Sequence, residues 1–171
     1  MKVVIQRVKS ASVSVNDSQI SCIGKGFLCL VGIHETDGPA DADWMIKQII
    51  SCKLFPGEDG KPWKRNISQI EGELLMVSQF TLYGKVYKRG KMDFHHAMSP
   101  DAAREYYSRF LDSLKEKTIT GKVYDGAFGE IMEVSLLNDG PITITLDSFE
   151  AIPREENNGP EEEKQLQETS T

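Results

Sequence analysis

The sequence contains 171 residues, of which 27% are charged and 39% are hydrophobic. This length suits a single domain, and this composition is typical of a soluble globular protein and excludes a wholly disordered chain. No apolar run approaches the ~20 residues that a membrane span requires. Arg7 interrupts the first apolar stretch, which excludes the core of a signal peptide. We therefore expect a cytoplasmic protein that does not enter a membrane.

The formal net charge of −6 is unevenly distributed. Residues 153–171 carry six glutamates against two basic residues, whereas residues 1–152 carry 20 acidic and 18 basic residues. A nearly neutral body does not favour coating of nucleic acid along its length, but it permits binding to one end of an RNA. The last segment is too polar to bury a core. The sequence therefore predicts one folded domain over residues 1–152 and a disordered acidic tail over residues 153–171.

The cysteines and histidines give no sign of a metal centre. The three cysteines never form a Cys-x-x-Cys pair, which indicates buried, reduced thiols rather than a zinc site or a disulfide framework; they are Cys22, Cys29 and Cys52. No two histidines have the spacing of metal ligands, and an adjacent pair points in opposite directions on a regular element. His34, His95 and His96 are the residues concerned. We expect no metal ion and no cofactor, with solvated or structural histidines.

The first 35 residues are expected to form strands. Residues 10–15 alternate serine with alanine and valine, a period of two that buries one face of a strand. The turn formers at residues 16–18 predict that residues 19–24 return as the second strand of a hairpin. The nearly continuous apolar run over residues 26–33 predicts a central strand that is covered on both faces.

Two helices and several further strands follow. After Gly38-Pro39, apolar residues between 42 and 50 recur at helical spacing. A second helix is expected to begin at Pro100, with Ser99 as its N-cap and an apolar stripe over residues 103–114. Further strands are expected over residues 73–82, 128–137 and 142–146. Two helices together with six or seven strands predict a domain of the α+β class.

Two segments depart from these patterns, and such departures are common at functional sites. Residues 78–81, Ser-Gln-Phe-Thr, place three hydrogen-bonding side chains at the end of an apolar strand. The alternative is a strand that simply emerges into solvent. Gly140-Pro141 precedes a well-patterned strand and forms either a plain turn or a cis peptide bond, which proline makes accessible. Neither a glycine-rich phosphate loop nor a Gly-x-Ser-x-Gly elbow is present.

The two segments together resemble the paired signature of the D-aminoacyl-tRNA deacylase family. The matching stretches are Val77–Leu82 and Asn138–Thr143, and shorter matches occur at residues 1–8, 11–13, 24–26, 93–95 and 125–129. The resemblance extends from Met1 to about Asp147 and leaves out the tail. It implies a barrel-like α+β homodimer with two active sites at the subunit interface.

The resemblance also assigns roles to particular residues. One wall of each active site would be formed by Ser78, Gln79, Phe80 and Thr81. Gly140-Pro141, in the cis form, would reach in from the other subunit, and a methyl group added at Gly140 is expected to block the pocket while the fold survives. Arg7 would help to hold that motif. Phe128 and Met132 would line the pocket for the terminal adenine of tRNA.

The implied substrate is an amino acid esterified to the terminal ribose of tRNA, and it includes glycine mischarged onto tRNA-Ala. Ester hydrolysis requires an attacking water and stabilisation of the developing oxyanion. The resemblance implies that the 2′-hydroxyl of the tRNA assists the water and that backbone N–H groups near Phe80 and Thr81 hold the substrate. Without a general base the Thr81 hydroxyl would be a weak nucleophile, so we interpret Thr81 as a positioning residue.

Three alternatives remain open at this stage. A sister branch of the family edits certain mischarged L-amino acids, but that branch carries Pro-Gln where this chain has Ser78-Gln79, and its Gly-Pro bond is trans. A catalytically silent interaction protein is a second alternative, with the acidic tail as its docking segment. Within the deacylase hypothesis, the basic loop over residues 85–91 is either solvated or in contact with acceptor-stem phosphates.

Overall fold

The computed structural model describes residues 1–119 and 122–153. The acidic tail expected from residue 153 onward lies outside the described residues from position 154, so its disorder remains a prediction. None of the helices in the described ranges is long and apolar enough to cross a bilayer.

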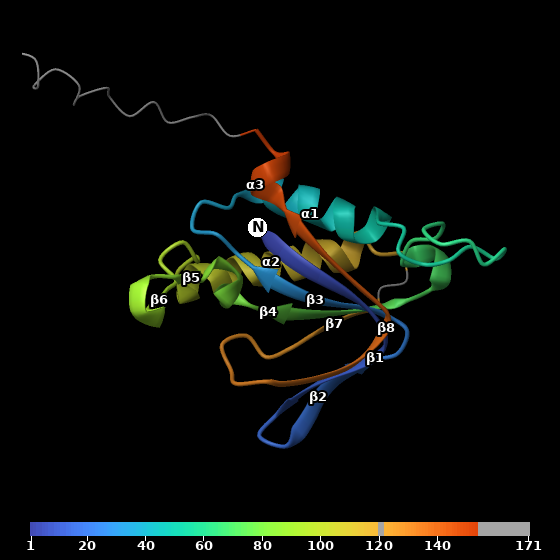
Figure 1. Cartoon of the computed structure of the whole chain (residues 1–171), viewed down its shortest axis with the longest axis horizontal. Helices are drawn as coiled ribbons and strands as arrows, with labels where there is room; N and C mark the ends of the chain where they lie inside the picture. Colours follow the sequence, from blue (N-terminus) through green and yellow to red (C-terminus); the bar gives the residue numbers. More distant parts are fainter. Residues whose placement is uncertain (120–121, 154–171) are drawn as a thin grey trace, which may run out of the picture.

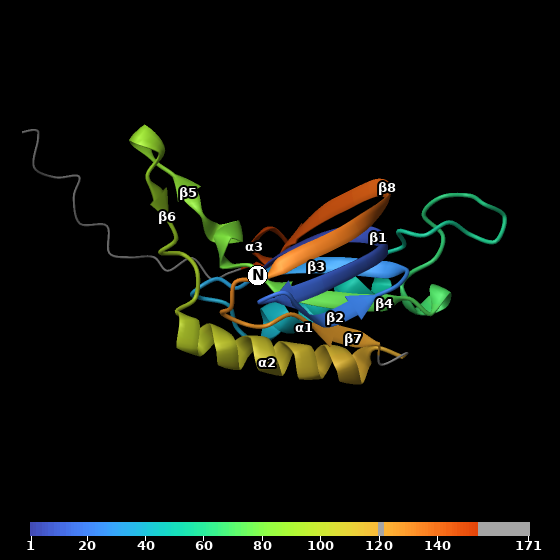
Figure 2. The ribbon, with the colours of Figure 1, turned by 90° about the horizontal axis from the view of Figure 1, so that it is seen from below.

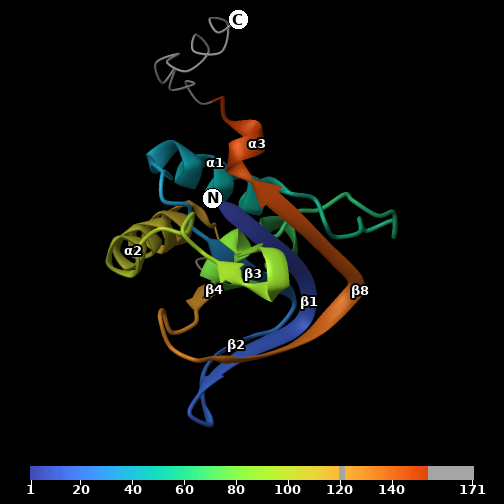
Figure 3. The same ribbon diagram turned by 60° about the vertical axis from the view of Figure 1, so that its left-hand side comes forward.

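One curved sheet forms the body of the protein (Figures 1 and 3). Its strands run in the order β2-β1-β3-β4-β7, and β8 pairs with β1 as well. The bounds are β1 Lys2–Val15, β2 Ser18–Ile23, β3 Gly26–Gly32, β4 Glu73–Ser78, β7 Val123–Asp125 and β8 Glu133–Asp147. The long strands β1 and β8 pair antiparallel and bend together, so the sheet curls toward a half-closed barrel. This agrees with the barrel-like α+β fold that the resemblance implies.

The first hairpin and the two long helices confirm the sequence patterns. Asn16 and Asp17 both have positive φ, as the tight turn between β1 and β2 requires. Helices α1 (Pro39–Ser51) and α2 (Pro100–Lys117) lie on one side of the sheet (Figure 2). Their apolar stripes face the main core, which contains Met45, Ile46, Ile49, Tyr107, Phe110 and Leu114. An additional short helix, α3 (Ser148–Ala151), follows β8.

Three strand boundaries differ from the sequence-based expectation. The strand that was expected to continue to residue 82 ends at Ser78, because a 3-10 turn over Phe80–Tyr83 takes its place. The two strands expected around Gly140-Pro141 are one long strand, β8, which begins only at Glu133. A small hairpin of β5 (Lys85–Val86) and β6 (Met92–Asp93) projects from the body (Figure 2).

Strands β3 and β4 are parallel neighbours that approach unusually closely at Gly26. Gly26 is opposite Glu73, and Val31 is opposite Ser78 at the other end of the pair. A Cβ atom at position 26 would lie 1.8 Å from the backbone oxygen of Glu73. Glycine is therefore required there for steric reasons, and this contact fixes the distance between the two strands.

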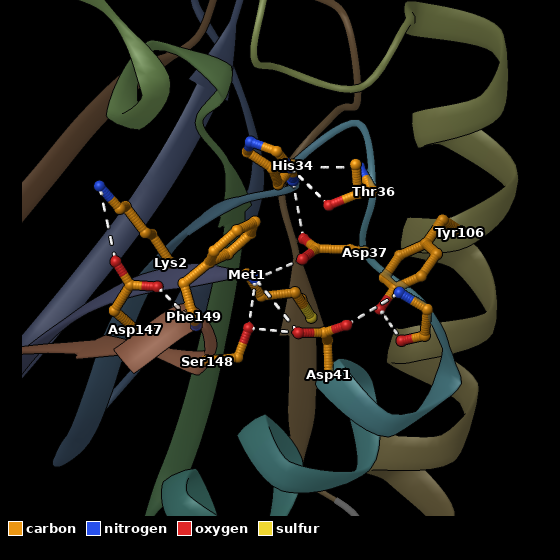
Figure 4. Close-up of polar contacts among 11 residues, drawn as sticks. Met1, Lys2, His34, Thr36, Asp37, Asp41, Tyr106, Asp147, Ser148 and Phe149 are labelled. Carbon is orange, nitrogen blue, oxygen red and sulfur yellow. Dashed lines mark hydrogen bonds and ion pairs between the residues drawn. The ribbon is translucent and has the colours of Figure 1, made fainter. Parts of the chain in front are cut away.

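The N-terminal ammonium of Met1 is buried where the start of β1 and the end of β8 approach the start of α1 (Figure 4). This buried group donates to the Asp37 carboxylate at 2.6 Å and to the Ser148 hydroxyl at 2.5 Å, and Asp41 lies 3.9 Å away. Ser148 also donates to Asp41 at 2.6 Å. The network therefore joins the start of β1 and the end of β8 to the start of α1.

Candidate active site

A cavity of about 480 Å³ opens where the parallel strands β3 and β4 end. Sites in sheets of this kind commonly lie beyond the carboxyl ends of parallel strands. The cavity is lined by Val31, Ile33, Ser78, Gln79, Phe80, Phe94, Ala97, Met98, Ser99, Pro100, Ala103, Phe128 and Gly129. Three members of the Ser-Gln-Phe-Thr segment therefore line the cavity, and so does Phe128.

The backbone places this wall by continuing the β3–β4 pairing one residue beyond the strand. The Gln79 N–H donates to the Val31 oxygen at 2.7 Å, after which the chain turns. Phe80 begins the 3-10 turn with 58% of its surface exposed, and its ring meets Phe94 edge-on with centroids 5.2 Å apart. The strand thus ends in a turn that presents Ser78, Gln79 and Phe80 to the cavity.

Thr81 lies in the same turn but does not line the cavity. Its hydroxyl accepts a hydrogen bond of 2.5 Å from the Gln79 side-chain amide. An amide N–H is a donor and cannot remove a proton from that hydroxyl. Phe80 and Thr81 open the turn, so their backbone N–H groups have no partner within it. The Gln79–Thr81 hydrogen bond therefore links the residue before the turn to the turn itself.

The opposite wall comes from helix α2, the loop before it and the segment after β7. Phe128 packs against Tyr107 with ring centroids 5.6 Å apart, and the Arg104 guanidinium lies 4.8 Å above its ring. Met132 accepts a hydrogen bond at its sulfur from the Ala127 N–H at 3.2 Å and does not itself line the cavity. The sequence reasoning missed the loop before α2, which supplies Ala97 and Met98.

Gly140 and Pro141 lie elsewhere in this subunit. Their peptide bond is cis, and neither residue lines the cavity of its own chain. Arg7 Nε forms an ion pair with the Asp139 carboxylate at 3.0 Å and donates to the Asp139 backbone oxygen at 3.2 Å, and Nη1 donates to the Leu54 oxygen at 2.5 Å. Arg7 therefore holds the residue that precedes the Gly140-Pro141 motif.

The expectation that Gly140→Ala leaves the fold undisturbed needs correction. Gly140 has φ +129°, a conformation that L side chains rarely adopt. A Cβ atom there would lie 2.8 Å from Cγ1 and 2.9 Å from the backbone nitrogen of Ile142. The added methyl group collides with its own chain before it meets any substrate.

The titratable groups behind the cavity are shifted mainly by burial. Burial raises the pKa of the Asp125 carboxyl, while the Tyr107 hydroxyl, which donates to it at 2.7 Å, lowers that pKa. Burial also raises the pKa of the Cys52 thiol to about 11. All three cysteines are free, but only Cys29 is fully buried, whereas Cys22 is exposed, so the expectation of buried thiols is wrong for Cys22. None of these groups lines the cavity.

A second cavity, of about 280 Å³, lies beyond the other side of the 3-10 turn. His34 and His96 both line it, with ring centroids 5.6 Å apart. Burial lowers the pKa of His34, which favours its neutral form. The structure thus brings together two histidines that are far apart in sequence, and sequence spacing gave no sign of this.

Comparisons with known proteins agree with this architecture. A family model described as D-Tyr-tRNA(Tyr) deacylase matches residues 4–147. A D-aminoacyl-tRNA deacylase of Dictyostelium discoideum is 44% identical over 151 residues, which cover 88% of this chain and 99% of the relative. One of Saccharomyces cerevisiae is 45% identical over 148 residues, covering 86% and 99%.

Two solved structures share the fold. A c-Myc DNA unwinding element binding protein is 41% identical and superposes with a TM-score of 0.82, covering 86% of this chain and 98% of the other. A probable eukaryotic D-amino acid tRNA deacylase has a TM-score of 0.72 at 18% identity, covering 85% and 97%, and supports the fold alone. With the family model matched over most of the domain, this chain belongs to the D-Tyr-tRNA(Tyr) deacylase family.

Proposed function

We propose that the protein hydrolyses the ester bond of D-aminoacyl-tRNA and releases a free D-amino acid and tRNA. One observation carries the proposal: Ser78, Gln79 and Phe80 form a wall of the 480 Å³ cavity, and no residue that lines this cavity is an acid, a base or a thiol. Such a lining suits a substrate whose bond is already activated. Aminoacyl esters of tRNA have this property, and relatives at 44–45% identity carry the name D-aminoacyl-tRNA deacylase.

The chemistry then depends on positioning rather than on proton transfer by a side chain. The backbone N–H groups of Phe80 and Thr81, which have no partner within the turn, would hold the ester and stabilise the developing oxyanion. The 2′-hydroxyl of the tRNA would direct the attacking water. The Gln79 amide, which donates to Thr81, fixes the conformation of this turn, so Thr81 acts through the turn and forms no covalent intermediate.

The terminal adenosine is proposed to bind against Phe128. This ring lines the cavity and is backed by Tyr107 and Arg104, so it offers a rigid face for stacking. Met132 supports the segment through the Ala127 N–H. The same arrangement suits glycyl-tRNA mischarged onto tRNA-Ala, because glycine has no side chain for the site to exclude.

The active form is proposed to be a homodimer. Gly140-Pro141 does not line the cavity of its own subunit, so the motif is available to the site of another. Exposed apolar side chains near and along β8 are consistent with a buried partner surface; they include Ile131 at 93% and Leu137 at 57% exposure. Each site would then be completed by the partner subunit's motif, and the protein would act on tRNA in the cytoplasm.

A deacylation assay tests the proposal. Purified protein should release the amino acid from D-aminoacyl-tRNA and leave the matching L-aminoacyl-tRNA intact, while light scattering reports the mass of a dimer. Cleavage of mischarged L-aminoacyl-tRNA alone would place the chain with the sister editing enzymes. No hydrolysis of any charged tRNA by folded dimer would indicate a silent interaction protein.

A further inference from the structure

Three metal-ligand side chains converge beside the second cavity. His34 and Glu35 follow β3, whereas His96 precedes α2. Their ligand atoms all lie within 4.8 Å of one another. Two imidazoles and one carboxylate are a ligand set used by zinc sites that keep one coordination position open.

The backbone holds the two loops in register. The Glu35 N–H donates to the His96 oxygen at 3.0 Å, and His34 forms an antiparallel bridge with Ala97. The Met98 N–H donates to the Ile33 oxygen at 3.0 Å. The positions of the three residues are therefore set by main-chain pairing, and only the side chains need to adjust to a ligand.

The His34 ring is fixed on several sides. It packs edge-on against Tyr83 and Phe149, with centroids 5.0 and 4.5 Å away. Its Nδ1 accepts a hydrogen bond from the Thr36 backbone N–H at 3.2 Å and lies 3.0 Å from the Thr36 hydroxyl, and its own backbone N–H donates to Asp37 at 2.7 Å (Figure 4). Nε2 takes no part in these bonds. A metal on Nε2 requires the ring proton on Nδ1, so Nδ1–H would donate to the Thr36 hydroxyl in place of accepting from the Thr36 N–H, and such an outer contact is usual for metal-bound histidines.

A cation already lies against the cluster. The Lys85 ammonium is 2.8 Å from Nε2 of His96, and Nδ1 of His96 is 3.3 Å from the Glu35 carboxylate. The lone pair of the His96 ring therefore faces positive charge. A divalent ion would have to displace this ammonium, since the two cations repel each other at such a distance.

We propose that His34, Glu35 and His96 bind a divalent transition metal of the Zn²⁺ type in competition with the Lys85 ammonium. Ligand atoms at the usual Zn–N distance are about 3.3 Å apart in a tetrahedral site, so the present spacing of up to 4.8 Å closes by about 1.5 Å. Glu35 is exposed and His96 is partly exposed, which leaves both side chains free to make that adjustment. The open position faces the 280 Å³ cavity that His34 and His96 line.

The proposed ion would also fix one wall of the main cavity. His96 lies between Phe94 and Ala97, which both line the 480 Å³ cavity. A metal shared by His34 and His96 would tie this loop to the end of β3. The binding itself is independent of the proposed hydrolysis, and its test needs no tRNA.

The test is a metal titration of the full chain in a Cys22→Ser background, which removes the exposed thiol as a competing ligand. After chelator treatment and dialysis, Co²⁺ should give the intense visible absorption of a tetrahedral site at one equivalent per chain, and Zn²⁺ should abolish it. His96→Ala and Glu35→Gln should each weaken binding by about tenfold or more. Lys85→Met should tighten it by about tenfold.

His95→Ala is the matched control. His95 pairs with Asp93 and supplies none of the three ligand atoms, but its ring packs against that of His96 with centroids 3.8 Å apart. The variant therefore removes a neighbour of the cluster without removing a ligand, and its Co²⁺ affinity should equal that of the parent. Circular dichroism of each variant establishes that it is folded. Unchanged binding in folded His96→Ala protein would overturn the site, and so would equal or weaker binding in Lys85→Met. Loss of binding in His95→Ala alone would place the metal elsewhere.

Discussion

The Arg7 guanidinium contacts Asp139 twice, as an ion pair with the carboxylate at 3.0 Å and as a hydrogen-bond donor to the backbone oxygen at 3.2 Å. Both contacts are made by Nε, and Nη1 donates a second hydrogen bond, to the Leu54 oxygen. The planar guanidinium reaches both partners at once, which a lysine ammonium cannot do with the same geometry. The position of the Gly140-Pro141 motif therefore depends on an arginine at the start of β1.

Arg7→Lys is expected to lower kcat/KM for D-aminoacyl-tRNA by at least about tenfold, or about 1.4 kcal/mol of transition-state stabilisation. Steady-state kinetics and thermal unfolding would measure the effect. Arg65→Lys is the matched control, because Arg65 also donates to a loop carbonyl, that of Pro56, but has no bond to Asp139. Equal losses of activity in both variants would argue against a specific role for Arg7.

Thr81→Ala should reduce the deacylation rate by no more than about a hundredfold, a loss below about 3 kcal/mol. The substitution removes the acceptor of the Gln79 amide and so loosens the turn, but it removes no nucleophile. Single-turnover kinetics give the rate, and mass spectrometry of quenched wild-type protein searches for an intermediate. An aminoacyl ester on Thr81 in the wild type would contradict the positioning role.

Chiral selection should operate by exclusion. A rigid wall in the place of an L side chain rejects every L residue regardless of its chemistry, whereas attraction would have to suit D residues of every size. Wild-type protein should therefore cleave D-aminoacyl-tRNA and glycyl-tRNA and spare L-aminoacyl-tRNA. Parallel assays of the three substrates on one tRNA measure this, and rapid cleavage of ordinary L-aminoacyl-tRNA would reject the exclusion mechanism.

Gly140→Ala should lower thermal stability as well as activity, because the methyl group collides with Ile142 in its own chain. Differential scanning calorimetry measures the first effect and deacylation of D-aminoacyl-tRNA the second. Gly38→Ala is the control, since a Cβ atom there meets nothing within 4 Å. Wild-type stability in Gly140→Ala would mean that β8 relaxes around the new side chain.

Neutralising Lys85, Lys88, Arg89 and Lys91 together should weaken tRNA binding if the projecting β5–β6 hairpin meets acceptor-stem phosphates. Each lost phosphate contact should reduce the dependence of log K on log salt by roughly one unit of slope. Binding assays at several salt concentrations measure that slope. If the variant binds tRNA as tightly as wild-type protein does at both low and high salt, the hairpin lies outside the tRNA interface.

Tyr107→Phe should destabilise the fold in a pH-dependent manner. Burial raises the folded-state pKa of Asp125 above its usual value, so the protein loses stability as pH rises through that pKa. The Tyr107 hydroxyl offsets part of this loss by bonding the carboxylate at 2.7 Å. The variant should therefore be about 1–2 kcal/mol less stable near neutral pH, and the difference should narrow at low pH, where Asp125 is protonated in the folded protein.

Urea unfolding near pH 7.5 and near pH 4 gives both free energies. Tyr106→Phe serves as the control, because the Tyr106 hydroxyl donates to the uncharged Gly38 carbonyl at 2.7 Å. Its cost should be similar at both pH values. A pH-independent cost in Tyr107→Phe would mean that the Asp125 carboxylate does not depend on this hydrogen bond.

Periodicity predicted the elements whose burial is regular. The hairpin at Asn16-Asp17 and helix α2 after Ser99 follow from local turn chemistry and an apolar stripe, and both are confirmed. The sequence pattern predicts two strands in place of β8, because Gly140-Pro141 is locally typical of a turn. In the structure β8 continues through this motif, and its pairing with β1 has an irregular register between Gln6 and Ser10.

The wall at residues 78–80 was predictable because polar side chains follow an apolar strand. The contact of His34 with His96 was not, since it depends on how the loop before α2 packs against the end of β3. Backbone pairing such as that of Glu35 with His96 is decided by the tertiary fold, and neither segment has a periodic sequence pattern that would predict it. The same holds for Ala97 and Met98 in the cavity wall.

The close approach at Gly26 has a consequence for the interpretation of mutational scans. Any side chain at position 26 would push β4 away from β3, and β4 ends at Ser78. The displacement would pass along a rigid parallel pair to the cavity wall. A mutational scan that measures activity alone would therefore rank Gly26 beside the residues of the cavity. Gly26 nevertheless lies at the start of β3, at the opposite end of the strand pair from the cavity, and contacts no substrate.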